Sequence, residues 1–298
     1  MSDILVLVSG NDTKPLKLFD IETVKNILKN YHINSISGDW LHPEKAFEIK
    51  SSERIHINIL HHVRQEMGNK EIDVFLVSSV NRRKKLLLAD MDATIVEGET
   101  LDDLADRAGM KDKISAITER TMRGELDFKS ALIERVMMLK DLSLSALIET
   151  RKSIILNRGA SDVIRVMRKF GAECYLVSGG FTFFTEEIAQ KCNFNGHHGN
   201  QLEIISDYLS GHVIPPILDK DSKLSFLYHY TKKLGLNPNE TMAVGDGAND
   251  IPMLQGSGLG VGYHPKPLVK DKINNHIIHT DLISLLYIQG YTWQDIKA

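Results

Sequence analysis

Residues 86–94 read Leu-Leu-Leu-Ala-Asp-Met-Asp-Ala-Thr. The four apolar residues predict a strand that is covered on both faces, as the strands of a parallel sheet are. The strand ends abruptly in Asp90 and Asp92, two carboxylates close enough to repel each other unless a cation or a shared proton relieves the repulsion. This stretch therefore indicates a buried strand with a chemically active carboxyl end. An ordinary polar loop after a strand is the competing interpretation.

Two later apolar runs end in the same way. Residues 172–177, apolar except for Glu173, lead into Ser178, and residues 241–245 lead into Asp246. Helical segments at 162–170, 182–192 and 222–234 separate these runs. Strand–helix alternation of this kind predicts an α/β fold with a doubly wound parallel sheet. Ligands bind beyond the carboxyl ends of the strands in such sheets, which is where these polar residues are expected.

The residues that follow these runs suit charged ligands. Ser178 precedes Gly179 and Gly180, so a hydroxyl group and backbone N–H groups are expected together at a helix N-terminus, which favours an anion. Asp250 follows Asp246 by four residues, or about one helical turn, with glycines that let the backbone approach a ligand. Each signal alone is weak, because a glycine-rich turn that caps a helix has the same appearance.

Residues 100–157 interrupt the alternation of strands and helices. Four helical segments follow one another there, at 101–108, 114–122, 128–139 and 145–153. Asp127 and Ser143 are suited to cap the third and fourth. Residues 201–205 and 209–213 read as a hairpin at the sheet edge. We therefore expect a helical cap inserted after the first strand of the sheet.

The first 80 residues have a different pattern. Their apolar runs and turn signals predict the order β-α-β-β-α-β, a small α+β domain. Residues 82–85 are all basic, and such a short charge run is more typical of a solvated junction than of a nucleic-acid site. The predicted domains are 1–80 and 81–298, with the cap inside the second.

Composition limits the classes of function. The chain has 298 residues, 42% of them hydrophobic, with 36 basic and 39 acidic side chains and a net charge of −3. These are ordinary globular values without a basic excess, so we expect no nucleic-acid partner. Two cysteines, Cys174 and Cys192, fit free thiols in a reducing compartment. The apolar runs are short and no basic leader precedes them, so we expect a soluble, cytoplasmic protein without a membrane partner.

Four motifs occur in a fixed order after successive strands: D-x-D-x-T at 90–94, S-G-G at 178–180, Lys223 at the start of a helix, and G-D-G-x-N-D at 245–250. A lone lysine at such a position is normally exposed, so the order matters more than any one motif. Together the motifs resemble the haloacid dehalogenase (HAD) superfamily of phosphatases over residues 85 to about 280. The resemblance implies a HAD-like Rossmannoid sheet with an inserted cap.

The cap segment gives a closer resemblance, to the phosphoserine phosphatases of that superfamily. Glu99 lies nine residues after Asp90, and Met122 and Phe128 lead to Arg135. The N-terminal unit resembles the ACT-like domain that bacterial members often carry. Position 93 is Ala where relatives often have Ser or Gly, a change that leaves both carboxylates in place.

The resemblance implies a role for each of these residues. Asp90 is the nucleophile that forms an aspartyl-phosphate, and Asp92 is the general acid and base, which requires a raised pKa. Mg²⁺ is held by Asp90, the Asp92 carbonyl and Asp246, and Asp250 orients its ligands. Ser178, Gly179, Gly180 and Lys223 bind the phosphate, and Asn249 reaches either the phosphate or the seryl part of the substrate. In the cap, Glu99 accepts from the substrate ammonium, Arg135 holds its carboxylate, and Met122 and Phe128 close the pocket.

The expected reaction is hydrolysis of O-phospho-L-serine to L-serine, the last step of L-serine biosynthesis. Two alternatives stay open. One is a phosphatase or phosphotransferase for another small amine-bearing phosphomonoester. The other is a non-enzymatic amino-acid-sensing protein, against which the retained acid pairs and Lys223 argue. A homodimer through the N-terminal domain and feedback by serine are further hypotheses.

Overall fold

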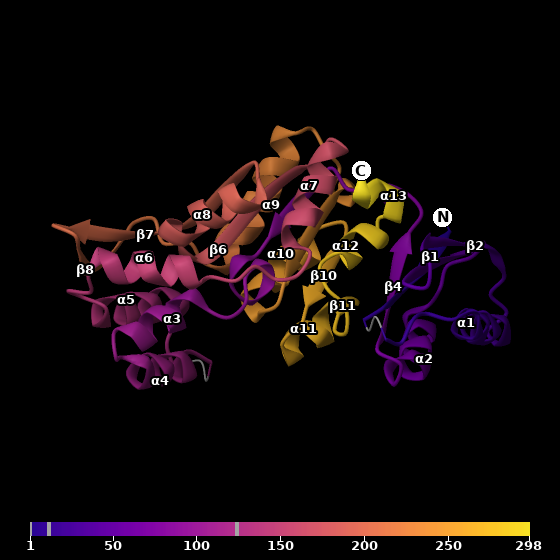
Figure 1. The fold of residues 1–298 in the computed structure, drawn as a ribbon, viewed down its shortest axis with the longest axis horizontal. Coiled ribbons are helices and arrows are strands. Elements are labelled where there is room, and N and C mark those ends of the chain that lie inside the picture. Colours follow the sequence, from indigo (N-terminus) through magenta and orange to yellow (C-terminus); the bar gives the residue numbers. More distant parts are fainter. Residues whose placement is uncertain (1, 11–12, 123–124) are drawn as a thin grey trace.

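The computed structural model describes residues 2–10, 13–122 and 125–298, and it contains two separate sheets (Figure 1). The seven-stranded sheet has the order β11-β10-β9-β5-β6-β7-β8. Its strands in that order are Asn275–Ile277, Gly260–Tyr263, Thr241–Gly245, Leu86–Ala89, Glu173–Phe181, Gly196–Ile205 and Tyr208–Ile214. All neighbours pair in parallel except β7 and β8, which form the hairpin. The predicted doubly wound α/β sheet is confirmed.

Strand β5, whose four residues are all buried, lies at the centre of this sheet between β6 and β9. Its side chains alternate between two cores, as the pleat of a strand requires. Leu87 and Ala89 belong to the core on one face, and Leu86 and Leu88 to the core on the other. The first face is covered by α7 (Ala160–Lys169) and α8 (Thr182–Cys192), and the second by α9 (Lys220–Lys233), α10 (Ile251–Gly256) and α11 (Pro267–Lys272).

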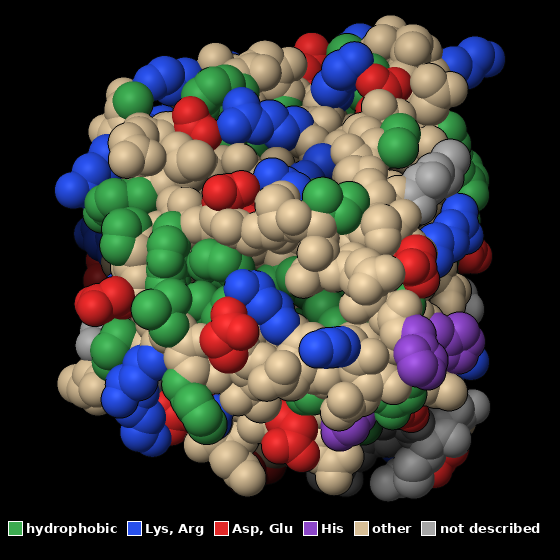
Figure 2. Space-filling model, turned by 90° about the vertical axis from the view of Figure 1, so that its right-hand side faces the viewer, with side chains coloured by type: hydrophobic (Ala, Val, Ile, Leu, Met, Phe, Trp, Pro, Cys, Tyr) green, Lys and Arg blue, Asp and Glu red, His purple; other side chains and the backbone are tan. Residues whose placement is uncertain are grey.

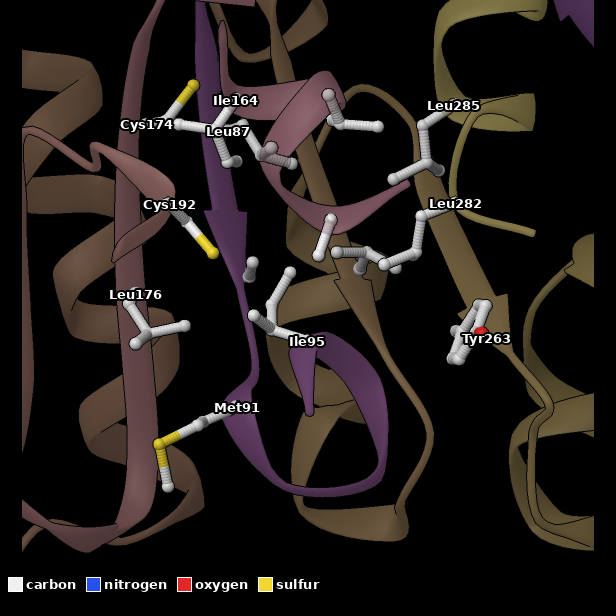
Figure 3. Packing of buried hydrophobic residues seen from close by; sticks show 14 of the residues in the cluster. Leu87, Met91, Ile95, Ile164, Cys174, Leu176, Cys192, Tyr263, Leu282 and Leu285 are labelled. Atoms are coloured by element: carbon white, nitrogen blue, oxygen red, sulfur yellow. The ribbon is translucent and has the colours of Figure 1, made fainter. Parts of the chain in front are cut away.

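Figure 3 shows the first of these cores from close by. Leu87 of β5 lies beside Ile164 of α7 and Cys174 of β6. Cys174 and Cys192 are both buried and free, as the sequence predicts. Burial raises the pKa of the Cys174 thiol to about 12, so this thiol stays protonated and behaves as a small apolar side chain.

The helical cap follows β5, as expected. It consists of α3 (Thr100–Arg107), α4 (Lys111–Met122), α5 (Phe128–Met138) and α6 (Leu144–Ser153). Asp127 caps α5 by accepting hydrogen bonds from the backbone N–H groups of Lys129 and Ser130, and Ser143 caps α6. The segment that leads into the cap and the segment that leads out of it lie side by side, because Val96 and Leu156 form an isolated antiparallel bridge.

The N-terminal sheet has the order β2-β3-β1-β4 and is antiparallel throughout. Its strands in that order are Ser35–His42, Ala46–Ser51, Asp3–Ser9 and Ile72–Ser78, with helices α1 (Leu18–Asn30) and α2 (Ile57–Gly68). The two helices pack on one face of the sheet, and buried side chains of β1 and β4 on the other face join the first core of the large sheet. The β-α-β-β-α-β order is as predicted.

Two polar clamps join β4 to the turn and strand at the edge of the large sheet. The Asn275 amide accepts from the backbone N–H of Leu76 and donates to its carbonyl, both at 3.0 Å. The Asp73 carboxylate accepts from the backbone N–H groups of Ile278, His279 and Thr280 at 3.0 Å and from the Thr280 hydroxyl at 2.7 Å. The small sheet is therefore docked through specific hydrogen bonds.

Figure 2 shows the side of the molecule on which the N-terminal sheet lies, and basic and acidic side chains are interspersed there. This mixed surface agrees with the net charge of −3. Within the described residues, no helix combines the length and the apolar character needed to cross a membrane.

Two details of the large sheet differ from the sequence prediction. Strand β6 does not stop at Val177 but continues to Phe181, so Ser178 to Gly180 lie within the strand and not at a helix start, while helix α8 begins at Thr182 as predicted. Strand β7 starts at Gly196 and pairs with β6 before it enters the hairpin. The pairing of β6 with β7 is interrupted between Val177 and Phe181, so the serine and the two glycines form an irregular stretch within the strand.

Candidate active site

Three strand ends meet at the carboxyl edge of the large sheet. Asp90 follows β5, Ser178 lies near the end of β6, and Asp246 follows β9. The backbone N–H of Asp90 donates to the carbonyl of Val244 at 3.0 Å, which ties the turn after β5 to strand β9. A cavity of about 120 Å³ opens there between the sheet and the cap.

Most of the residues that the sequence singled out line this cavity. They are Asp90, Asp92, Glu99, Phe128, Arg135, Ser178, Gly179, Gly180, Asp246 and Asn249. Lys223 and Asp250 are buried and contact the site from behind Asp90. Met122 is the last residue of α4, and its side chain lies outside the described part of the structure.

The acidic residues from β5 and β9 converge on one point. Carboxylate oxygens of Asp90, Asp246 and Asp250 lie within 4.8 Å of one another, and all three side chains are buried. A set of carboxylate oxygens at this separation fits a hard cation such as Mg²⁺. The arrangement contradicts the simpler interpretation that Asp90 belongs to an ordinary polar loop.

Lys223 neutralises part of this charge. Its Nζ lies 2.6 Å from Asp90 Oδ1 and 2.6 Å from Asp250 Oδ1. Burial alone would lower the pKa of Lys223, but the charges of Asp250 and Asp90 outweigh it and raise that pKa, so the lysine stays an ammonium ion. Asp250 also accepts from the backbone N–H of Gly247 at 3.0 Å. Lys223 is thus a buried counter-ion and not the exposed lysine that its position on a helix suggests.

Burial also shifts the pKa of Asp90. Removal from water raises the pKa of its carboxyl, the charge of Asp250 raises it further, and Lys223 opposes both. Burial and Asp250 likewise raise the pKa of Asp246, against the charge of Lys266. A divalent cation among these carboxylates would favour their ionised forms.

Asp92 is held by two donors. Its Oδ1 accepts from the backbone N–H of Thr100 at 2.8 Å, and its Oδ2 accepts from the Ser178 hydroxyl at 3.1 Å. Burial raises the pKa of Asp92, while the hydrogen bonds from Thr100 and Ser178 lower it, and burial dominates. A raised pKa is what the sequence analysis expected of a general acid.

The Ser178-Gly179-Gly180 segment is shaped by close contacts. The backbone N–H of Gly180 donates to the Ser178 hydroxyl at 2.8 Å, so this amide is already occupied, contrary to the expectation of a free N–H at a helix start. A β-carbon at Gly180 would come within 2.9 Å of Asp92 Oδ2, and one at Gly179 within 3.2 Å of the Phe128 ring. Glycine therefore lets both the acid and the cap approach the strand.

The cap contributes two charged groups to the cavity. Burial, together with the charge of Asp92, raises the pKa of Glu99 to about 7, against the charge of Lys266. Arg135 donates through Nε to the carbonyl of Ala131 at 3.2 Å and forms no salt bridge with a described residue. An acidic and a basic group in one small cavity suit a ligand that carries both charges.

Two contributors were not found from the sequence. The backbone N–H of Thr100 orients Asp92, and no sequence signal marks a backbone donor. Lys266 lines the cavity, with its Nζ 3.1 Å from Asp246 Oδ2 and 3.4 Å from Glu99 Oε1. Its position just after strand β10, at the carboxyl edge of the sheet, was the available signal.

Comparisons with known proteins agree with this geometry. A family model described as haloacid dehalogenase-like hydrolase matches residues 87–255. A phosphoserine phosphatase from Archaeoglobus fulgidus is 36% identical over 241 residues, which cover 80% of this chain and 70% of that protein. A phosphoserine phosphatase from Mycobacterium tuberculosis is 38% identical over 217 residues, 73% of this chain, so the chain spans 53% of that relative's length.

A solved structure extends the likeness to the whole chain. It is described as a probable phosphoserine phosphatase from Vibrio cholerae in unliganded form, and it is 25% identical with a TM-score of 0.79. The match covers 99% of this chain and 88% of that one, so it includes the N-terminal sheet. The chain therefore belongs to the haloacid dehalogenase-like hydrolase family and, within it, to the phosphoserine phosphatases.

Proposed function

We propose that this chain is an Mg²⁺-dependent phosphomonoester hydrolase that converts O-phospho-L-serine to L-serine and phosphate, the last step of L-serine biosynthesis. One observation carries the proposal: carboxylates from two separate strand ends, Asp90 and Asp246, meet in a buried cluster. That cluster borders a cavity with an acidic and a basic side chain from the cap. The similarity to phosphoserine phosphatases supports the substrate.

Asp90 acts as the nucleophile. An Asp90 carboxylate oxygen attacks phosphorus, and the bond from phosphorus to the serine oxygen breaks, which leaves an acyl phosphate on Asp90. Water then attacks this phosphorus and releases phosphate and the free carboxylate. The central position of β5 supports this role, because it fixes Asp90 between the phosphate-binding segment of β6 and the acids after β9.

Asp92 moves the protons. Burial raises its pKa, which is the direction that a general acid requires, and as that acid Asp92 protonates the leaving serine oxygen. The resulting carboxylate takes a proton from the attacking water in the second half of the reaction. Hydrogen bonds from Thr100 and Ser178 hold both of its oxygens, so the group is oriented before substrate binds.

The phosphate oxygens are stabilised by fixed donors. Ser178, the amides of Gly179 and Gly180, and Lys223 are assigned to this task, with Asn249 reaching the phosphate or the seryl part. Without substrate the Gly180 amide donates to the Ser178 hydroxyl and that hydroxyl donates to Asp92, so these two donors would exchange their present partners for the phosphate. Because Lys223 is buried against Asp90, its charge acts in a site of low dielectric, where it is worth more than in water.

Mg²⁺ would be held by the side chains of Asp90 and Asp246 and the backbone carbonyl of Asp92, with Asp250 beside them. The bound cation supplies charge that offsets the repulsion between a carboxylate nucleophile and a phosphate dianion. The three carboxylates of the buried cluster support this choice of cation, since hard oxygen ligands suit it.

The cap selects the substrate. Glu99 accepts from the substrate ammonium, and Arg135 holds the substrate carboxylate with two parallel hydrogen bonds. The Phe128 ring, which lies close to Gly179, closes the pocket against bulk water. The assignment of Met122 to the same closure stays a prediction from the sequence. So do the cytoplasmic location, the division into domains 1–80 and 81–298, the ACT-like character of the first, and a homodimer through it.

Trapping of the phosphoenzyme tests the nucleophile. Acid-quenched reactions with O-phospho-L-serine should carry an alkali-labile phosphoryl group on the peptide that contains Asp90, detected by mass spectrometry. The Asp90→Asn variant should carry none. Phosphorylation of another residue would refute the assignment of Asp90.

A further inference from the structure

The loop after strand β10 folds back over the cavity. The backbone N–H of Lys266 donates to the carbonyl of Asp246 at 2.9 Å, and the N–H of His264 donates to the carbonyl of Ile277 at 2.8 Å. A β-carbon at Gly262 would meet the Pro265 ring at 2.9 Å, so the loop packs tightly on its own strand. The backbone of Lys266 is therefore fixed against the residue that carries one of the cluster carboxylates.

The Lys266 side chain reaches across the mouth of the cavity. Its Nζ lies 3.1 Å from Asp246 Oδ2 on the sheet side and 3.4 Å from Glu99 Oε1 at the start of the cap. The side chains of Lys266 and Glu99 are 51% and 46% exposed, and that of Asp246 is 7% exposed. Lys266 thus joins a buried carboxylate of the core to a half-exposed carboxylate of the cap.

Glu99 needs such a partner because its surroundings are acidic. Asp92 and Asp246 line the same cavity, and their charges act on Glu99 along with that of Asp102. A flexible glutamate among like charges would turn outward to water, since like charges at short range are disfavoured. An ammonium anchored on the core opposes that movement and keeps the carboxylate at the cavity.

We propose that Lys266 is a positioning residue that holds the Glu99 carboxylate at the mouth of the cavity and thereby sets the preference for phosphomonoesters that carry an amine. This inference rests on the proposed function, in which Glu99 accepts from the substrate ammonium. The substrate ammonium takes the place of Nζ of Lys266 at the Glu99 carboxylate. Because this carboxylate is already in position, binding costs less side-chain entropy.

The test compares two substrates that differ in one group. O-phospho-L-serine and 3-phosphoglycerate share the carboxylate, the three-carbon chain and the phosphate, but the second has a hydroxyl in place of the ammonium. We define the amine preference as the ratio of kcat/KM for the first to that for the second. Where turnover of 3-phosphoglycerate is too slow, the inhibition constants of the two compounds against p-nitrophenyl phosphate hydrolysis give the amine preference in binding alone.

Lys266→Met should lower the amine preference about fivefold, the scale expected for a partly exposed ion pair. The loss should fall mainly on KM for phosphoserine, because Lys266 does not touch the reacting atoms. Lys266→Arg should restore the preference, since a guanidinium can span the same two carboxylates. Lys270→Met is the matched control: it removes an exposed lysine of helix α11 that does not line the cavity, and it should leave the ratio unchanged.

A double-mutant cycle shows whether Lys266 acts through Glu99 or through Asp246. In the Glu99→Gln background, Lys266→Met should change the amine preference by less than about twofold, because the group that Lys266 positions is gone. An equal loss in both backgrounds would overturn the inference, as would an equal loss for both substrates. A wild-type protein without any amine preference would overturn the proposed substrate as well, whereas a preference that survives Lys266→Met would overturn the inference alone.

Discussion

Nζ of Lys223 lies 2.6 Å from Oδ1 of Asp90, and both side chains are almost completely buried. The lysine comes from helix α9 and the aspartate from the end of β5, which are far apart in the sequence. The same nitrogen lies equally close to Asp250. This single ammonium therefore holds together two carboxylates that would otherwise repel each other in a site of low dielectric.

Removal of that ammonium should cost both stability and activity. Lys223→Met leaves Asp90 and Asp250 as uncompensated buried charges, and breaking a buried pair in this way lowers the free energy of unfolding by about 3 kcal/mol. Urea unfolding of the two proteins measures the difference at neutral pH. Lys232→Met, at an exposed position near the end of the same helix, is the control. A loss below about 1 kcal/mol would mean that Lys223 is not the counter-ion of the cluster.

The role of Asp92 as an acid predicts a dependence on the leaving group. Asp92→Asn should lower kcat for O-phospho-L-serine by about 100-fold or more, because the departing alkoxide is then not protonated. Formation of the phosphoenzyme from p-nitrophenyl phosphate should be much less affected, since nitrophenolate leaves without a proton. Stopped-flow absorbance of the first turnover measures this step. Equal losses for both substrates would point to a purely structural role of Asp92.

The pKa of Glu99, raised to about 7 by burial and by the charge of Asp92, predicts a pH effect on substrate binding. As the pH falls through 7 the carboxylate is protonated and no longer attracts an ammonium, so KM for phosphoserine should rise between pH 8 and pH 6. The substrate phosphate also titrates near this range, and Glu99→Gln controls for it. The variant should show a flatter profile; profiles of the same shape would show that Glu99 does not contact the ammonium.

The clamp between the two sheets predicts a stability effect far from the cavity. Asp73 accepts four hydrogen bonds from the turn after β11, and Asp73→Ala leaves the buried N–H and hydroxyl of Thr280 and two part-buried backbone N–H groups without this partner. We expect a loss of about 2 kcal/mol in the free energy of unfolding. Asp39→Ala, which removes an exposed carboxylate of the same sheet, should change stability by less than about 0.5 kcal/mol. Calorimetry of both variants decides between docking through Asp73 and loose tethering.

Much of this fold could be predicted because the deciding patterns are local. Apolar runs that end in acids marked the central strands, and successive helical segments marked the cap between Thr100 and Ser153. The docking of the N-terminal sheet could not be predicted, since periodicity describes one element at a time. The continuation of β6 to Phe181, where pairing with β7 resumes after an irregular stretch, could not be predicted either, because local propensity does not encode the pairing of distant strands.

In the site, too, local patterns predicted some residues, whereas others depend on tertiary contacts. Asp90, Asp246 and Lys223 were found from the order of motifs, which fixes strand ends and so brings distant residues together. Lys266 was missed because a lysine after a proline in a loop resembles any exposed lysine. Its significance depends on the return of the loop onto Asp246, which is a tertiary contact.

Phosphate release from O-phospho-L-serine tests whether Asp90 and Asp246 act together around one divalent cation. The wild-type protein should release phosphate with Mg²⁺ and lose that activity in excess EDTA, with recovery when Mg²⁺ is restored. Asp90→Asn and Asp246→Asn should both be inactive at the same cation concentration. Undiminished hydrolysis in EDTA, or by either variant, would show that the reaction does not depend on a cation held by Asp90 and Asp246.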